Sequence, residues 1–370
     1  MEIIVKKIMF HINSLGKGGA ERVIVNLSEE LASLNNECII ATEWKDDDEY
    51  PLNNTVRRID VGVKGKENEY SSSSLRKKRG QLLRAAILSE KPDVVISFCR
   101  NANYRAILAA RGTKVPVIFS VRSDPKTDYA SLKDKVLSTF LYNMAAGAVF
   151  QTGEARDFFP KSIAKKSTVI LNPLNKKYIN LEAPTKRRRV IVTAGRFHEA
   201  KDHIVLLKAF ERVMNDYADV NLELYGAKSE DNTYELIKDY VMKHNMSDRV
   251  LFMGNSNKLE ELIIDAGVFV LSSKYEGMPN ALMEAMAMKL PVVSTDCPCG
   301  GPRELIINEK NGLLVKVGDD EMMANAIRFM LDNPQRADEM GIEAGKISKE
   351  ADPKIIAGKW LEYINAKVKP

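Results

Sequence analysis

Short apolar segments typical of buried strands alternate with helical segments along this chain, and this alternation restricts the possible fold more than any other feature. In the first half, a strand-like segment at 7–13 is followed by a helical one at 19–33, and further strand-like segments lie at 38–42, 93–98, 115–121, 147–151 and 168–171. Strands connected by helical crossovers form parallel sheets. The sequence therefore predicts a doubly wound α/β structure.

The alternation stops around 172–189 and then starts again, which indicates two domains. The interruption contains Pro173, Pro184 and the basic run Lys186-Arg187-Arg188-Arg189, as in a linker. Beyond it, a helical segment spans 203–215 and strand-like segments lie at 190–194, 221–225, 250–253, 268–271, 291–295 and 312–317. At 370 residues the chain also exceeds one ordinary core.

We predict four parts from this pattern. The first is an N-terminal Rossmann-like domain over 1–172, followed by a linker over 173–189. A C-terminal Rossmann-like domain covers 190–351, and a last helix at 352–370 packs back on the first domain. In such sheets ligands bind at the carboxyl ends of the strands, where the informative loops of this chain fall.

Composition excludes several classes of protein. Hydrophobic residues make up 45% and charged residues 28%, as in a soluble globular protein. No apolar run approaches the roughly 20 residues that cross a bilayer. Residues 1–7 show no signal peptide, so a cytoplasmic protein is expected. The net charge of +5 is too modest for a nucleic-acid binder, and the four cysteines lack zinc-ligand spacing.

One basic cluster, at 75–88, has apolar residues near helical spacing beside a stripe of Arg76, Lys77, Lys78, Arg79 and Arg84. Two interpretations stay open. The stripe is either the outer side of a helix packed on its own sheet, or a peripheral contact with anionic lipid headgroups at the inner face of the cell membrane.

A strand, a tight turn and a helix follow one another at 266–288. Gly277 and Pro279 break the strand, and Pro279 suits the first turn of the helix. Helix amides and a positive dipole then point at one spot, which is a site for an anion such as phosphate. Glu276 and Glu284 flank this spot, and sugar hydroxyls are suitable partners for them. A nucleotide sugar supplies phosphate and hydroxyls together.

The second domain opens with Gly195-Arg196, and Lys201 follows at the next turn. A guanidinium and an ammonium at one strand end suit a diphosphate. The alternative is that Glu199 and Asp202 absorb these charges in surface pairs. The turn at Glu276 on the same sheet edge favours the diphosphate clamp.

Glycines also follow the first strand, at Gly16, Gly18 and Gly19. They almost match a dinucleotide-binding motif, but Glu21 replaces the third glycine, and only Glu43 near the second strand end supports that reading. We expect the glycines to approach a bulky ligand, with a structural turn as the alternative. His198 with His203, and the acidic run at 46–49, are expected to be ordinary loop and helix residues rather than metal ligands.

Together these motifs resemble glycosyltransferase family 4, the retaining nucleotide-sugar transferases with the GT-B fold. The resemblance covers essentially the whole chain. It rests on the Gly16–Gly19 loop, on Gly195-Arg196 with Lys201, and on Glu276 and Glu284 with seven residues between them. The segments at 279–287, 291–296 and 300–304 are similar to enzymes that build bacterial capsule, exopolysaccharide and lipid-linked glycans.

The resemblance implies roles for individual residues. Arg196 and Lys201 would hold the donor diphosphate and act in catalysis with Glu276, which would face the transferred sugar. Glu284 would accept hydrogen bonds from the ribose. Further donor contacts would come from Gly18, Gly19, Asn255, Gly277, Met278, Pro279, Asn280, Ala281 and Leu282. The donor is expected to be a UDP-sugar used without a metal, and the acceptor a glycan or lipid-linked glycan.

One position departs from the family. Many relatives carry a histidine after the strand that corresponds to 117–121, whereas this chain has Arg122. An arginine cannot act as a base, so Arg122 is expected to orient an acceptor phosphate or the donor sugar. The predicted activity is retaining transfer of a hexose or N-acetylhexosamine. The alternatives are a nucleotide-sugar epimerase or hydrolase of the same fold, and a non-catalytic sugar-nucleotide binding protein.

Overall fold

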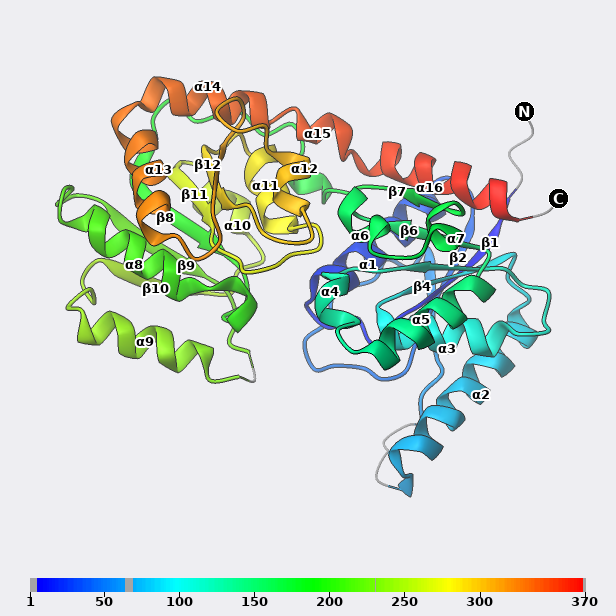
Figure 1. The fold of residues 1–370 in the computed structure, drawn as a ribbon. Coiled ribbons are helices and arrows are strands. Elements are labelled where there is room, and N and C mark those ends of the chain that lie inside the picture. Colours follow the sequence, from blue (N-terminus) through cyan, green and yellow to red (C-terminus); the bar gives the residue numbers. More distant parts are fainter. Residues whose placement is uncertain (1–4, 64–68, 230, 369–370) are drawn as a thin grey trace. The chain divides into compact units, whose positions relative to one another are not determined.

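The computed structural model describes residues 5–63, 69–229 and 231–368 (Figure 1). The chain folds into two compact units. One comprises the residues up to Pro173 together with those from Pro353 onward, and the other is Leu174–Asp352. Residues 1–4, on which the expectation of no signal peptide partly depends, lie outside the described residues.

The first unit is built on a parallel sheet with the strand order β3-β2-β1-β4-β5-β6-β7. Its strands are β1 (Lys7–His11), β2 (Glu37–Thr42), β3 (Val56–Asp60), β4 (Val94–Phe98), β5 (Val117–Ser120), β6 (Gly147–Phe150) and β7 (Ser167–Val169). The order of the strands reverses between β1 and β4, and such a switch point opens a crevice at the carboxyl ends of the strands.

Helices cover both faces of this sheet. They are α1 (Gly19–Ser33), α2 (Ser72–Glu90), α3 (Arg100–Ala110), α4 (Pro125–Asp128), α5 (Leu132–Met144), α6 (Gly153–Asp157), α7 (Lys161–Ala164) and the last helix, α16 (Pro353–Lys367). Leu27 and Leu31 of α1, four residues apart, lie on one helix face and are buried with Trp360 and Ile364 of α16 against the sheet. Helices α2, α3 and α5 are successive neighbours (Figure 1).

The second unit repeats this construction with the strand order β10-β9-β8-β11-β12-β13. Its strands, all paired in parallel, are β8 (Arg188–Ala194), β9 (Asn221–Tyr225), β10 (Val250–Gly254), β11 (Ala266–Leu271), β12 (Val292–Thr295) and β13 (Leu313–Val315). The switch point lies between β8 and β11. The prediction of two doubly wound parallel-sheet units is confirmed.

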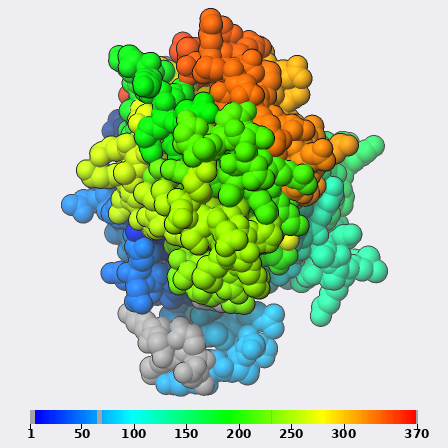
Figure 2. All heavy atoms as spheres, turned by 90° about the vertical axis from the view of Figure 1, so that its left-hand side faces the viewer, coloured from blue at the N-terminus to red at the C-terminus, as the bar shows by residue number. Residues whose placement is uncertain are grey.

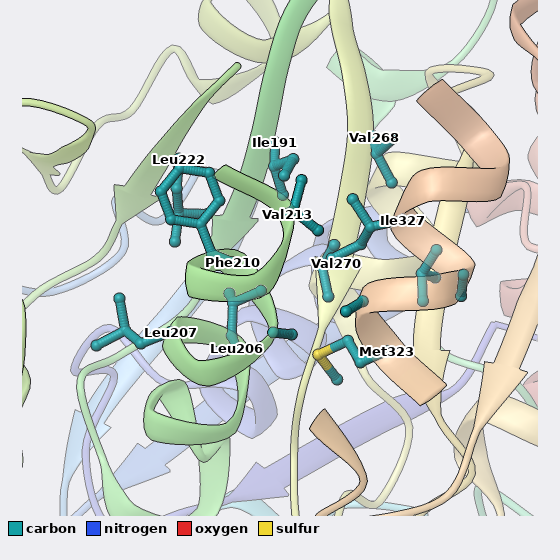
Figure 3. Close-up of a cluster of buried hydrophobic side chains, with 14 of the residues drawn as sticks. Ile191, Leu206, Leu207, Phe210, Val213, Leu222, Val268, Val270, Met323 and Ile327 are labelled. Atoms are coloured by element: carbon teal, nitrogen blue, oxygen red, sulfur yellow. The ribbon is translucent and has the colours of Figure 1, made fainter. Parts of the chain in front are cut away.

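The main core of the second unit lies between its sheet and two long helices. Leu206, Phe210 and Val213 of α8 (His203–Met214) face the strands, because residues three or four apart share one side of a helix. Met323 and Ile327 of α13 (Asp320–Asp332) pack beside them, against Val268 and Val270 of β11 (Figure 3). These side chains are almost fully buried.

The remaining helices of this unit are shorter or lie farther out. They are α9 (Thr233–Lys243), α10 (Leu259–Ile263), α11 (Asn280–Ala287), α12 (Gly301–Leu305), α14 (Pro334–Ala344) and α15 (Ile347–Glu350), and a short 3-10 helix, η3 (Glu199–Lys201), follows β8. Helix α9 lies at the surface, among the yellow-green side chains of Figure 2.

The segment assigned to a linker by sequence lies against the second unit over most of its length. The Leu174 amide donates to Ala351 O (2.9 Å), and Lys177 Nζ lies 2.5 Å from Glu260 Oε2. Arg187 is paired with Asp338 and also donates to the Lys289 carbonyl, while Arg188 already belongs to β8. The basic run therefore serves structural ion pairs.

Candidate functional site

The loops after β8 and β11 meet at the switch point of the second sheet. Gly195 follows β8, and a Cβ atom placed on it would lie 3.4 Å from Lys201 Cε. The stem of Lys201 therefore passes directly over Gly195, at ordinary van der Waals distance. This arrangement directs the lysine ammonium toward the loop that follows β11.

Lys201 meets Glu276 across this switch point. The lysine Nζ lies 2.5 Å from Glu276 Oε1, and Ser273 Oγ donates to the same oxygen at 2.7 Å. Ser272 Oγ donates to the Lys201 carbonyl at 2.8 Å, which ties the two loops together. Both charged side chains are partly buried, so the pair is less screened by water than a surface pair. The two serines were not among the residues expected from the sequence.

The turn that carries Glu276 is held by backbone on both sides. The Lys274 amide donates to the Ala200 carbonyl, and the Glu276 amide donates to the Pro298 carbonyl at 2.7 Å. The Cys299 amide returns a bond to the Glu276 carbonyl at 2.9 Å. Cys297 and Cys299 are buried in this supporting loop, and neither forms a disulfide.

Helix α11 begins directly after this turn. Pro279 immediately precedes its first residue, Asn280, whereas the sequence analysis places this proline in the first turn. The first-turn amides of a helix, here those of Asn280, Ala281 and Leu282, have no acceptor within the helix and carry the positive end of its dipole. Gly277, Met278 and Pro279 are buried beneath this helix start. Glu284, farther along α11, is only 4% exposed.

Arg196 and Asn255 follow β8 and β10, two strands of the same sheet that are separated by β9. Both are exposed, and within residues 5–63, 69–229 and 231–368 no carboxylate pairs with Arg196. The Gly226 amide after β9 donates to Gly254 O at 2.8 Å, and a Cβ on Gly226 would overlap the Gly195 carbonyl oxygen. The backbone at the carboxyl ends of β8, β9 and β10 is therefore tightly packed beside Arg196.

The glycine loop of the first unit, with Gly18 and Gly19, lies at that unit's own switch point, after β1. Gly18 precedes α1, and its amide donates to the Gly16 carbonyl at 2.6 Å. Glu49 supports the loop, since its carboxylate accepts from the Leu15 amide and is paired with Arg58 at 2.5 Å. Burial opposes ionisation of Glu49, but these hydrogen bonds hold its pKa below the usual value.

The surroundings of Glu43 do not suit a dinucleotide-binding site. Its carboxylate is fully buried and contacts Arg105 of α3 and Arg79 of α2, the latter at 3.2 Å. His11 also lies near, but burial and Arg105 lower the pKa of its imidazole to about 3, so it is neutral. Because the Glu43 carboxylate is paired with two arginines, it is not available to bind a ribose. The sequence showed no signal for this cluster, because its members are distant along the chain.

Arg122 lies at the carboxyl end of β5 in the first unit. Its guanidinium stacks on Phe98 at 3.6 Å from the ring centroid and on Trp360 of α16 at 5.9 Å. Its Nη1 donates to Asn172 Oδ1 at 2.8 Å, whereas Nε and Nη2 are buried without a partner among the described residues. Burial lowers the pKa of Arg122 to about 9, so it stays charged at neutral pH.

The basic stripe of α2 is partly structural. Arg79 contacts Glu43, and Arg84 Nη1 donates to the Ala109 and Arg111 carbonyls at the end of α3, at 2.9 and 2.6 Å. Arg76 and Lys77 remain exposed. In the part of the chain that the structure describes, no helix is long and apolar enough to cross a bilayer, and no group of three metal-binding side chains gathers.

Several predicted residues therefore come together, and others do not. Lys201 and Glu276 are in direct contact, and the turn from Gly277 to Leu282 continues from Glu276 into α11. Arg196 and Asn255 follow β8 and β10 of the same unit, with β9 between these two strands. Gly18, Gly19 and Arg122 belong to the first unit.

Two protein-family models match the chain. The model described as Glycosyltransferase Family 4 matches residues 17–177, and the model described as Glycosyl transferases group 1 matches residues 176–347. The first therefore covers most of the first unit and the second most of the second unit.

Two curated proteins of Campylobacter jejuni are similar over nearly their full lengths. One is GalNAc-alpha-(1->4)-GalNAc-alpha-(1->3)-diNAcBac-PP-undecaprenol alpha-1,4-N-acetyl-D-galactosaminyltransferase, 27% identical over 98% of this chain and 99% of the relative. The other is N-acetylgalactosamine-N,N'-diacetylbacillosaminyl-diphospho-undecaprenol 4-alpha-N-acetylgalactosaminyltransferase, 27% identical over 97% of this chain and 99% of the relative.

Solved structures with the same architecture complete the comparison. Anabaena HepE in complex with UDP and glucose superposes with a TM-score of 0.81 at 17% identity, over 98% of this chain and all of that one. A UDP complex of S. aureus TarM gives 0.80 at 16% identity, with 98% and 100% coverage. These likenesses confirm the GT-B fold. Because the two family models together span residues 17–347 and full-length relatives are glycosyltransferases, this chain belongs to the family 4-like glycosyltransferases.

Proposed function

We propose that this enzyme transfers a hexose or N-acetylhexosamine from a UDP-sugar to a lipid-linked glycan or polysaccharide, with retention at the anomeric carbon. The observation that carries the proposal is the contact between Lys201 and Glu276 beside the start of α11. A cation, a carboxylate and helix amides at one switch point match the parts of a nucleotide sugar. HepE, a structural relative, binds UDP and glucose, which supports this donor.

The donor diphosphate is bound by the charges of the second unit. Arg196 is exposed and without a carboxylate partner in the described chain, so it is available to a phosphate. Lys201 exchanges part of its contact with Glu276 for a phosphate oxygen. These two positive charges and the amides of α11 take the place of a metal ion in neutralising the diphosphate. Glu284 accepts from the ribose hydroxyls, and backbone near Asn255 meets the base.

The chemical step needs no protein nucleophile. The bond between the anomeric carbon and the phosphate oxygen breaks, and the acceptor hydroxyl oxygen bonds to that carbon on the same face. The hydroxyl proton passes to the departing phosphate, and UDP leaves. Arg196 and Lys201 stabilise the negative charge that develops on the phosphate, while Glu276 stabilises the positive charge on the sugar.

The acceptor class follows from the relatives. Both Campylobacter proteins are named for undecaprenol diphosphate-linked substrates, and neither is named as an epimerase or a hydrolase, which supports transfer to such an acceptor. We therefore also propose that the reaction takes place in the cytoplasm, at the inner face of the cell membrane. Arg122, with two N–H groups without a partner in the described residues, is suited to orienting a substrate phosphate or sugar.

The test combines a donor screen with three variants. Nucleotide sugars are incubated with lipid-linked acceptors, and product is measured by mass spectrometry. Arg196→Ala and Lys201→Ala are each expected to lower transfer by about 100-fold or more, in the range for removing one transition-state charge contact. Lys208→Ala, an exposed lysine on α8 of the same unit, is the matched control and should retain full transfer.

Near-normal transfer by either clamp variant, with folding verified by circular dichroism, would overturn the assignment of the clamp. Donor incubated alone separates the other functions. A transferase hydrolyses it slowly, an epimerase or hydrolase converts it at the full catalytic rate, and a non-catalytic binding protein retains it unchanged even when acceptors are supplied.

A further inference from the structure

Helix α5 carries large apolar side chains on its outer side. Leu132 is 78% exposed, Val136 62% and Phe140 66%, and Leu137 and Met144 are also exposed. Leu132, Val136, Phe140 and Met144 recur every four residues, so they form one line along the helix. Single exposed apolar side chains are normal, but four in one line with Leu137 beside them mark an interaction surface.

The inner side of α5 shows that this orientation is fixed by packing. Ser138, Leu141 and Tyr142 are buried. The Tyr142 ring stacks on Phe119 of β5 at a centroid distance of 3.8 Å, and its hydroxyl lies 2.5 Å from that of Tyr129. Turning the apolar row inward would break this stack, so the row stays at the surface. Helix α5 itself is a neighbour of α3 (Figure 1).

Exposed lysines accompany the apolar row, on α5 itself and on a helix packed against it. Lys133 and Lys135 are exposed on α5, and Lys161 and Lys165 are exposed at α7, which packs against α5. Among the described residues none of these four lysines has a carboxylate partner.

The acidic residues nearby are neutralised by their own partners. Asp134 lies 3.6 Å from Arg100, Glu154 lies 3.0 Å from Lys126, and Asp157 lies 2.8 Å from Arg156. The outer side of α5 therefore combines exposed apolar side chains with lysines that have no carboxylate partner among the described residues.

We propose that the outer face of α5 docks on the surface of an anionic lipid bilayer. A helix that lies in the bilayer interface has an apolar row with lysines beside it, and α5 has both. The apolar side chains enter between the lipid headgroups, and the lysines contact their phosphates. A symmetric contact between two copies fits less well, because it would bring the same lysines of both copies together, and protein interfaces are depleted in lysine.

This docking surface differs from the one expected on α2, where Arg79 and Arg84 serve contacts inside the unit. The inference rests on the proposed function only in its biological purpose, since a lipid-linked acceptor requires access to the membrane. The surface itself is independent of the residues assigned to the donor site.

The test is co-sedimentation of the full chain with vesicles of phosphatidylcholine, with and without phosphatidylglycerol. The parent should bind the anionic vesicles, and added salt should weaken the binding. A variant with Leu132→Ser, Val136→Ser and Phe140→Ser is expected to bind about tenfold or more weakly. A variant with Lys133→Glu and Lys135→Glu should lose binding to anionic vesicles.

The matched control places serine at two exposed apolar positions of α9 in the second unit, Leu236 (55% exposed) and Met242 (57%), and should bind like the parent. Undiminished vesicle binding by the α5 triple variant, folded by circular dichroism, would overturn the proposal. The proposal would also be overturned if the parent formed a dimer in gel filtration and the triple variant lost this dimer but still bound vesicles. Sugar transfer to a water-soluble acceptor should be the same in parent and variant, and its absence from both would count against the proposed function and not against the docking.

Discussion

At the scale of single residues, the proposed mechanism assigns both donor binding and catalysis to the contact between Lys201 and Glu276. In the structure, the Glu276 carboxylate compensates the charge of the Lys201 ammonium. In the proposed mechanism, the donor phosphate replaces Glu276 as the negative partner of Lys201 and releases Glu276 toward the sugar. The role of Glu276 is thus separable from that of Lys201.

Glu276→Gln tests this separation. The amide keeps the hydrogen bond with Ser273 but removes the negative charge, so Lys201 is left freer for phosphate. We expect kcat to fall by about 10- to 100-fold, with the donor KM unchanged or lower, because the lost interaction forms only in the transition state. Steady-state kinetics with varied donor measure both constants. A higher donor KM with an unchanged kcat would mean that Glu276 only binds the ground state.

His203, at the start of α8, makes stability depend on pH. It is 2% exposed, its Nδ1 has no partner among the described residues, and burial, then Lys201, lowers its pKa to about 4. The unfolded chain takes up the proton near pH 6.5, before the folded chain does, so stability is lost as the pH falls from about 6.5 to about 4.

Between pH 6.5 and pH 5 this histidine should cost about 1.5 kcal/mol of unfolding free energy. The measurement is urea unfolding of the parent and of His203→Leu at both pH values. Subtracting the two proteins cancels other titrating groups, such as His11. An equal loss in parent and variant would show that His203 does not titrate in this window.

At the scale of elements, the turn from Lys274 to Pro279 depends on the close approach of α12. A Cβ atom on Gly301, the first residue of α12, would overlap the Gly277 carbonyl oxygen and lie 2.8 Å from Pro279 Cδ. Only glycine permits this distance, and it holds the start of α11 in place.

Gly301→Ala should therefore displace the turn and lower transfer by about tenfold or more, since small misplacements at a site are costly. Gly80→Ala is the control, because a Cβ on Gly80 in α2 meets no atom within 4 Å. That change should leave activity intact and raise stability by about 1 kcal/mol, the gain from alanine over glycine in a helix. Steady-state kinetics and thermal unfolding of both variants test these expectations. Full activity of Gly301→Ala would refute the tight packing.

Helices and strands also differ in how well they can be predicted from the sequence. Central strands such as β4 and β11 are nearly continuous apolar runs, which the sequence predicts as strands because both of their faces are buried. Strand β3 was not predicted, since it lies at the sheet edge and includes Arg57 and Arg58, which pair with Glu90 and Glu49. Strand β3 is held by its hydrogen bonds to β2, and these tertiary contacts produce no apolar pattern in the sequence.

At the scale of the whole molecule, the end of the chain completes the first unit. Trp360 of α16 is 1% exposed, and its ring lies 6.0 Å from that of Phe98 of β4. With Ile356 and Ile364, it joins the core formed by α1 and the sheet. The first unit is therefore complete only when the last helix has been synthesised.

Trp360→Ala should destabilise the first unit by about 3 to 5 kcal/mol, as for other large aromatic side chains removed from a core. Chemical unfolding followed by circular dichroism measures the loss. Leu361→Ala, a change at a partly buried neighbour on the same helix, should cost clearly less. Equal effects of the two changes would show that Trp360 does not anchor α16.

The sequence by itself determined the two-unit α/β organisation and the strand ends that carry Lys201 and Glu276, because apolar periodicity and chain-breaking residues are local signals. Only the tertiary structure decided that Lys201 pairs with Glu276, that two arginines occupy Glu43, that Arg122 stacks on Phe98, and that α5 faces outward with its apolar side. Each of these depends on which distant segments become neighbours. Strand order and helix packing set that, and no local pattern of residues encodes it.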